Sequence, residues 1–127
     1  MQKKVIAISD ITSFGLSEFE QKRFFNRLES ELVNINQYTV TNRAEVDKIL
    51  AEQKFQNSGC TDSQCAAEIG RILNADLMLL ADVLYDKSSG DVSVTYKIVN
   101  VESAKITTSL TVDENVEAIK DISNNVY

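Results

Sequence analysis

A nearly continuous apolar run at residues 76–85 limits the folds that this chain can adopt. The run is far too short for a membrane-spanning helix, which needs roughly 20 apolar residues. It lacks the alternation of a half-exposed strand and ends at a turn-forming segment, so it is typical of a central strand buried on both faces. The sequence therefore predicts a sheet with this run at its centre.

The segment after this run has the pattern of an antiparallel meander. Residues 86–91 contain Lys-Ser-Ser-Gly, which favours a hairpin connection. From Val92 apolar and polar residues alternate, which is typical of a strand with one exposed face. The phase of this alternation breaks near Asn100, which predicts a bulge or a change in burial there. A second turn at 102–105 leads to a last alternating strand at 106–112.

Two capping boxes mark the starts of helices in the first half of the chain. Ser17 is followed three residues later by Glu20, so the two side chains can cap a helix start reciprocally. Asn42 and Glu45 have the same spacing. The predicted elements of this half are a strand at 4–11, a loop at 12–16, a helix from 17 to about 34, a strand at 38–41 and a helix from 42 to about 53. The first helix carries an apolar stripe, expected in the core, that consists of Phe24, Phe25, Leu28, Leu32 and Ile35.

Both cysteines of the chain lie in a loop that runs directly into a predicted helix at 62–73. We expect Thr61 to be the N-cap, with Gln64 completing a capping box. This cap puts Cys60 at position N′ and Cys65 at N4, the two positions that a hydrophobic staple brings together. The spacing favours a structural disulfide, and two reduced, buried thiols remain an alternative. A redox or metal role has less support, because four residues separate the cysteines and the chain has no histidine.

The resulting order of elements is β-α-β-α-α-β-β-β-α, with the last helix expected at about 114–125. Early strands separated by helices, followed by a meander, predict an α/β fold with one mixed sheet and helices packed against it. A chain of 127 residues without a Pro- or Gly-rich linker suits a single domain over residues 1–127.

Composition and motifs argue against nucleic-acid binding and against catalysis. The formal net charge of −6 disfavours a phosphate backbone as a partner. Histidine, the commonest general base and metal ligand, is absent, and the four glycines are isolated instead of forming a phosphate loop. Asp10 lies at the end of the first predicted strand, where open α/β sheets often place functional groups. Asp76 and Asp82 suggest a carboxylate pair, but they are better explained as residues at the start and the solvated end of a strand. We therefore predict no enzyme activity, no cofactor and no metal site.

The first residues begin like a signal peptide but do not continue as one. Lys3 and Lys4 supply positive charge, whereas the apolar stretch at 5–8 is too short for the apolar region of a signal. Either the protein is cytoplasmic, or a targeting segment has been removed and Met1 begins a shortened chain.

Several segments resemble the soluble domain of CsgG-like bacterial envelope proteins. The residues that carry this resemblance are Val5 to Asp10, Leu28 to Asn34, Tyr38 to Gln53, Ser58 to Gly70, Leu73 to Asp76 and Tyr96 to Ile106. The cysteine segment is the most specific of them, and together they cover nearly the whole chain. The family includes the curli secretion channel and, more distantly, lipoprotein activators of penicillin-binding proteins and the N-terminal domain of TolB.

The resemblance implies an anticodon-binding-domain-like domain in the periplasm, associated with an outer-membrane lipoprotein. It implies a non-enzymatic role in assembly or secretion, with another envelope protein or a second copy of the chain as the partner. It also favours a disulfide between Cys60 and Cys65, since disulfides persist in the periplasm. The connections at 86–91 and 102–105 are short, so a pore built from long hairpins, as in the curli channel, is not expected. Membrane attachment is expected only through a lipid anchor on a leader that has been removed.

We expect the recognition surface in loops, because loops carry binding residues more often than core elements do. The candidates are the loop around Phe14 and the loop Phe55–Ser63, with Phe14 and Phe55 as partner contacts. The alternative function is a cytoplasmic small-ligand or redox-regulatory domain that uses Cys60 and Cys65 as a thiol switch.

Overall fold

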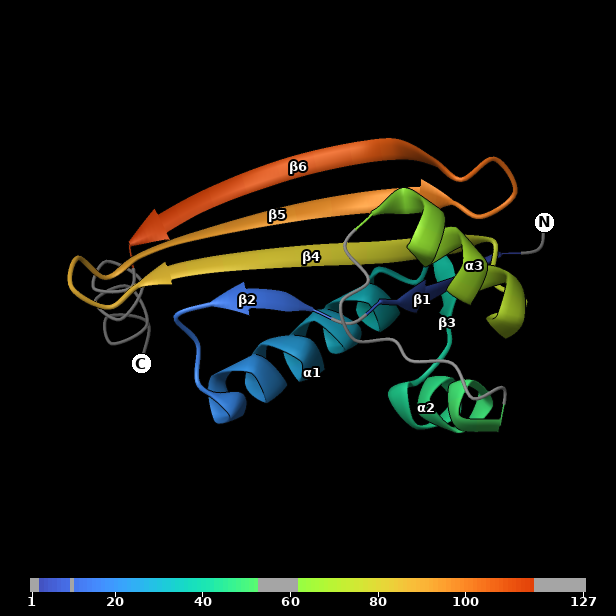
Figure 1. The fold of residues 1–127 in the computed structure, drawn as a ribbon, viewed down its shortest axis with the longest axis horizontal. Helices are drawn as coiled ribbons and strands as arrows, with labels where there is room; N and C mark the ends of the chain where they lie inside the picture. Colours follow the sequence, from blue (N-terminus) through green and yellow to red (C-terminus); the bar gives the residue numbers. More distant parts are fainter. Residues whose placement is uncertain (1–2, 10, 53–61, 116–127) are drawn as a thin grey trace.

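The computed structural model of the protein describes residues 3–9, 11–52 and 62–115 (Figure 1). Its elements are β1 (Lys4–Ile8), β2 (Thr12–Phe14), α1 (Glu18–Ile35), β3 (Tyr38–Val40), α2 (Arg43–Glu52), α3 (Ser63–Leu73), β4 (Leu77–Asp86), β5 (Asp91–Asn100) and β6 (Lys105–Asn115). The predicted order is confirmed up to the last strand, with β2 as an additional element. Within the described ranges, no helix has the length and apolar character needed to cross a membrane.

One mixed sheet joins the strands in the order β3-β1-β4-β5-β6. β1 pairs in parallel with β3 and with the first residues of β4, and β2 pairs in parallel with the second half of β4. β5 and β6 follow as an antiparallel meander. The predicted α/β fold with a mixed sheet is confirmed, and the apolar run at 76–85 supplies its central strand.

Helices cover both faces of the sheet at the end where β1 and β3 lie (Figure 1). On one face, Phe25, Leu28 and Leu32 of α1 pack against β1 and β4. Ile35, expected on the same stripe, is half exposed because it ends the helix beyond this contact. On the other face α2 and α3 form a larger core that includes Val46, Leu50, Ala66, Ala67, Ile69 and Leu73 from the helices and Ala7, Met78, Leu80 and Val99 from the strands.

Gly70 allows α3 to lie close to the sheet. A Cβ atom at this position would lie 2.4 Å from Cγ2 of Val101 and 3.0 Å from Cγ of Met78. Both distances are shorter than an ordinary van der Waals contact. The missing side chain therefore sets how closely this helix approaches the core.

The beginning of the chain differs from the sequence prediction. β1 ends at Ile8 and not at residue 11, and residues 12–14 form strand β2 inside the predicted loop 12–16. Three residues are too few to show a period in the sequence, and this strand exists because it pairs with β4. The hydroxyl of Thr12 reinforces the pairing by donating to Oδ1 of Asp82 at 2.7 Å.

The helix caps are predicted correctly in α1 and α2 but not in α3. Ser17 and Glu20 form the predicted capping box, and Asn42 Oδ1 accepts from the N–H of Glu45 at 2.9 Å. In α3 the N-cap is Asp62, whose Oδ1 accepts from the N–H of Cys65 at 2.8 Å.

The N-cap of α3 was predicted at Thr61, with Gln64 completing a capping box. This prediction is wrong by one residue, because aspartate is also a favoured N-cap. Cys65 is consequently at position N3 and not N4. A hydrophobic staple joins positions N′ and N4, so the staple no longer supports a disulfide through Cys65. Thr61, Cys60 and Phe55 lie outside the described residues, so the disulfide remains a prediction.

The meander agrees with the sequence pattern except at its end. The predicted irregularity near Asn100 is confirmed, because Ile98 pairs with Thr108 whereas Val99 pairs with Ile106. The final helix was expected to start at Glu114, but β6 continues through Asn115, since its pairing with β5 extends that far. The rest of that predicted helix lies outside the described residues.

Candidate functional site

The meander continues past α3, and among the described residues no helix lies over that face of the sheet there (Figure 1). Of residues 76–85, positions 77–81 are buried as predicted. Beyond them Asp82 and Leu84 are exposed, so burial on both faces is wrong for the second half of β4. The opposite side of this region is covered by α1, where Phe24 stacks on Tyr96 with ring centroids 6.5 Å apart. Burial raises the pKa of the Tyr96 hydroxyl above its ordinary value.

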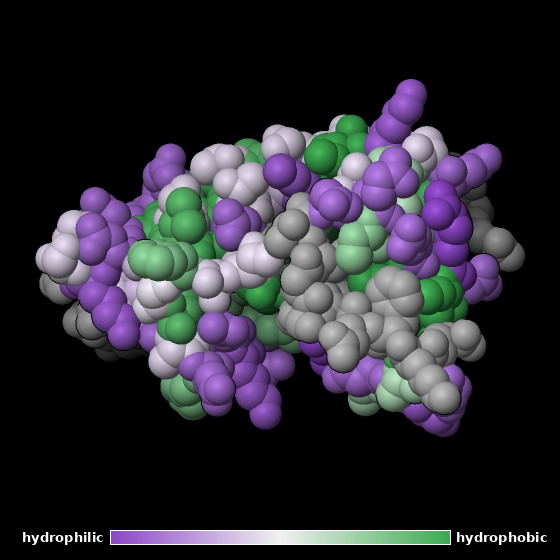
Figure 2. Space-filling model, viewed as in Figure 1, coloured by the Kyte–Doolittle hydropathy of each residue, from purple (hydrophilic) through white to green (hydrophobic). Residues whose placement is uncertain are grey.

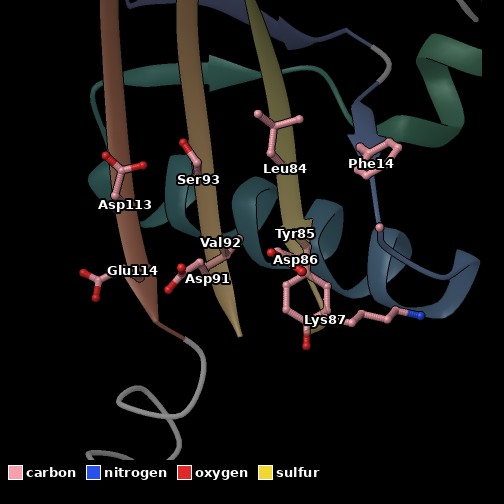
Figure 3. Close-up of a pocket in the computed structure, with 11 residues that line it drawn as sticks. Phe14, Leu84, Tyr85, Asp86, Lys87, Asp91, Val92, Ser93, Asp113 and Glu114 are labelled. Atoms are coloured by element: carbon pink, nitrogen blue, oxygen red, sulfur yellow. The ribbon is translucent and has the colours of Figure 1, made fainter. Parts of the chain in front are cut away.

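We define the distal face as eight side chains that share the uncovered side of β2, β4, β5 and β6. They form two cross-strand rows, one of Phe14, Leu84, Ser93 and Asp113, and one of Thr12, Asp82, Thr95 and Thr111. Figure 3 shows the first row side by side across the four strands. The two rows thus form one surface from segments up to about a hundred residues apart in sequence.

The apolar part of the distal face is Phe14 with Leu84. Phe14 is 73% exposed and Leu84 is 50% exposed, which is unusual for large apolar side chains. Phe14 of β2 is directly opposite Leu84 of β4, so the two side chains form one apolar patch. In the space-filling view, exposed apolar side chains are interspersed with polar ones toward this end of the sheet (Figure 2).

Gly15 positions Phe14 at the end of β2. Its φ of +89° belongs to the left-handed region, and a Cβ atom would lie 2.0 Å from the carbonyl oxygen of Tyr85. Only glycine therefore lets the chain turn away from β4 directly after Phe14. The backbone on both sides of this turn is held by strand pairing and by the start of α1.

The second row of the distal face is held by hydrogen bonds between neighbouring strands. Thr12 donates to Asp82, and the hydroxyls of Thr95 and Thr111 are 3.1 Å apart. These bonds fix polar side chains beside the apolar patch without covering it. The distal face is therefore preorganised, which lowers the entropy lost when a partner binds.

Acidic side chains surround the apolar patch. An open concavity of about 1070 Å³ beside Phe14 and Leu84 is also lined by Asp86, Lys87 and Glu114 (Figure 3). The hydroxyl of Ser88 donates to Oδ1 of Asp86 at 2.6 Å, and its backbone N–H donates at 3.0 Å. These bonds hold the pKa of the Asp86 carboxyl below its ordinary value, so Asp86 is ionised at neutral pH.

Asp76 and Asp82, the carboxylates weighed as a pair from the sequence, each accept a hydrogen bond from another strand. Asp76 accepts from the N–H of Val5 at 2.8 Å and joins the starts of β1 and β4, whereas Asp82 accepts from Thr12. Asp10 lies outside the described residues. In the described ranges, no three His, Cys, Asp or Glu side chains are grouped so that they could hold a metal ion.

Sequence reasoning named Phe14 as a candidate contact but did not name Leu84. Phe14 is on the distal face, and Phe55 lies outside the described part of the chain, so a role of Phe55 in binding stays a prediction. Leu84 was assigned to a strand buried on both faces. The signal that could have found it is the spacing of Asp82 and Asp86, which flank Leu84 on the same side of the strand.

Three solved structures of bacterial proteins share this fold. The C-terminal domain of LpoB from Escherichia coli is 12% identical, with a TM-score of 0.72 over 87% of this chain and 82% of that one. Lipoprotein GNA1162 from Neisseria meningitidis is also 12% identical, with a TM-score of 0.69 over 97% and 96% of the two chains. TolB from Acinetobacter baumannii has a TM-score of 0.58 and 12% identity, covering 91% of this chain and 24% of TolB. At these identities the likeness shows the fold alone, and no curated protein sequence matches the chain.

The family described as peptidoglycan-synthase activator LpoB matches residues 1–119. This match supports the activator part of the predicted resemblance, whereas TolB shares the fold alone, and the CsgG-like label is not shown. It gives no support to a redox-regulatory domain. An activator acts on an enzyme and is not itself one, so the predicted non-enzymatic, protein-binding role in the envelope is confirmed. Because the match covers nearly the whole sequence, the chain belongs to the LpoB family of peptidoglycan-synthase activators.

Proposed function

We propose that this domain binds a penicillin-binding peptidoglycan synthase in the periplasm and activates it, with the distal face as the contact surface. The family supports the kind of partner. We also propose that the protein is held at the outer membrane by a lipid anchor, as the description of the Neisseria relative as a lipoprotein suggests. The predicted disulfide between Cys60 and Cys65 fits that oxidising compartment.

The observation that carries the proposal is the exposed pair Phe14 and Leu84 on a rigid, uncovered sheet face. Burying a large apolar side chain contributes roughly 1.5–3 kcal/mol, and aromatic residues are frequent among the residues that dominate interfaces. A polar rim next to such a pair is the usual composition of a protein interface. The second row of the distal face supplies that rim.

The shape and charge of the distal face favour a protein partner of a particular kind. The concavity beside Phe14 is open and is not an enclosed pocket of the type that holds a small ligand. Asp82, Asp86 and Asp113 surround the apolar pair, so the partner should present an apolar centre with basic residues around it. Such complementarity sets the orientation of docking and increases its rate.

The test is the substitution Phe14→Ala, with Phe19→Ala as a matched control. Phe14 and Phe19 are 73% and 69% exposed, but Phe19 lies on α1 beside Arg23 and away from the distal face. We expect Phe14→Ala to weaken binding to a purified penicillin-binding synthase by roughly ten-fold or more, since about 1.4 kcal/mol corresponds to that factor. Stimulation of glycan polymerisation should fall in parallel, whereas Phe19→Ala should change neither.

Calorimetric titration and a polymerisation assay measure the two effects, and thermal unfolding checks the fold of each variant. Both side chains are largely exposed, so neither variant should lose stability. Equal binding by the two variants would rule out the distal face as the contact surface. Absence of any binding by the unmodified domain would instead rule out the proposed partner.

A further inference from the structure

β6 forms one edge of the sheet, and no described strand pairs with its outer side. It is the longest strand, with eleven residues, and its side chains from Lys105 to Glu114 are exposed. The opposite edge, β3, has only three residues. Short edge strands resist pairing with other chains, whereas a long exposed edge is a template for an additional strand. The two edges therefore differ in their capacity to accept a partner.

The middle of β6 lacks the charges and prolines that usually prevent strand pairing. Residues 106–112 are Ile-Thr-Thr-Ser-Leu-Thr-Val, which contain no charge and no proline and have high β-propensity. The one irregularity is at Thr107, which has no opposite residue in β5. From Thr108 the pairing with β5 is regular to the end of the strand. Within the described part of the chain, the regular segment 108–114 is therefore an unpaired edge with Thr111 at its midpoint.

The side chains of this segment suit a second copy of the same strand. Leu110 and Val112 are 57% and 36% exposed on the α1 side of the sheet, and in an antiparallel pair about Thr111 each would lie opposite the other. The acidic side chains near the end of β6 meet no like charge in such a pair. Asp113 lies opposite Ser109 of the other copy and Glu114 lies opposite Thr108, and both of these residues are uncharged.

We propose that two copies of this chain associate by antiparallel pairing of their β6 strands around a two-fold axis at Thr111. The two sheets become one continuous sheet, which is an isologous interface in which the same residues contribute from both copies. Leu110 of one copy packs against Val112 of the other. Thr111 and Asp113 belong to the distal face, so the proposed pairing places two such faces on the same side of the joined sheet.

The first test is the substitution Leu110→Lys, with Val33→Lys on α1 as the control. Val33 is 55% exposed, close to the value for Leu110, so both monomers should remain folded. A lysine on an edge strand is a natural block against pairing. We expect Leu110→Lys to raise the dimer dissociation constant roughly ten-fold or more in sedimentation velocity, and Val33→Lys to leave it unchanged.

The second test fixes the register with single cysteines. Residues directly opposite in an antiparallel pair have Cα atoms about 4.5–5.5 Å apart, within the range of a disulfide. Thr111→Cys should therefore cross-link two copies under mild oxidation. Ser109→Cys should not, because its equivalent in the other copy lies roughly 13 Å away along the strand.

Two outcomes would overturn the proposal. One is a wild-type chain that stays monomeric at high concentration, and the other is a dimer that Leu110→Lys does not affect. If the chain is monomeric and Leu110→Lys abolishes binding to the synthase, the edge is assigned to that partner. Cross-linking through Ser109→Cys instead of Thr111→Cys would contradict the axis. None of these outcomes depends on the Phe14 experiment.

Discussion

On one face of the sheet, the two ends differ in how well helices cover them. Leu80 and Leu84 lie on the same strand and project to the same side, yet Leu80 is 8% exposed under α3 and Leu84 is 50% exposed beyond it. Around Leu80 the helices α2 and α3 build the larger core. Around Leu84, on the distal face, none of the described helices covers the sheet.

This comparison separates the part of the sheet that stabilises the domain from the part available for recognition. α1 covers the opposite face along most of the sheet, so the uncovered end is supported from behind. A single rigid sheet therefore serves both purposes. Substitutions at the covered end should change stability, and substitutions at the distal face should change binding.

The largest difference is expected between Leu80→Ala and Leu84→Ala. Removing a buried leucine leaves a cavity, so Leu80→Ala should lower the free energy of unfolding by about 2–5 kcal/mol. Leu84→Ala should lower it by less than about 1 kcal/mol, because half of that side chain already contacts water. Urea denaturation of the two variants measures both values.

The two substitutions should have the opposite order of effect on binding to the synthase. Leu84→Ala should weaken binding, whereas Leu80→Ala should not at temperatures where it is folded. Similar losses of stability in the two variants would show that the distal face belongs to the folding core, and the comparison between the two ends would then fail.

A smaller effect is expected where α3 approaches the sheet. Gly70→Ala introduces a Cβ atom 2.4 Å from Val101 and should cost about 1–3 kcal/mol through overpacking. In a Val101→Ala background the same substitution should cost less, because the clashing methyl groups are gone. A double-mutant cycle by thermal unfolding measures the coupling. A cost that is equal in both backgrounds would place the strain elsewhere.

The smallest effect concerns the acidic rim. Ser88 holds the pKa of Asp86 below its ordinary value of 3.8, so the folded state binds this proton less readily than the unfolded state. The resulting stabilisation is present above pH 3.8 and is lost as the pH falls through the lower folded value. Asp86→Asn and Ser88→Ala should each flatten the acid side of the stability curve slightly. Unchanged curves in both variants would show that the Ser88 contacts contribute nothing in solution.

Most of the secondary structure could be predicted because it depends on neighbours in sequence. Ser17 and Glu20 cap α1 through contacts three residues apart, and the apolar run supplied the central strand. The α3 cap was misplaced by one residue because Thr61 and Asp62 are both good N-caps. The strand β2 could not be predicted, since its three residues are ordered only by pairing with β4.

The sequence by itself determined the fold class, the family and the order of the described elements apart from β2, because periodicity, caps and motifs are local features of the chain. Only the tertiary structure decided where the helices stop covering the sheet. Whether Leu84 is buried or exposed depends on how far α3 reaches over β4, and the side chains of the distal face come from strands distant in sequence. Burial is a property of packing between elements, so a pattern within one strand could not reveal it.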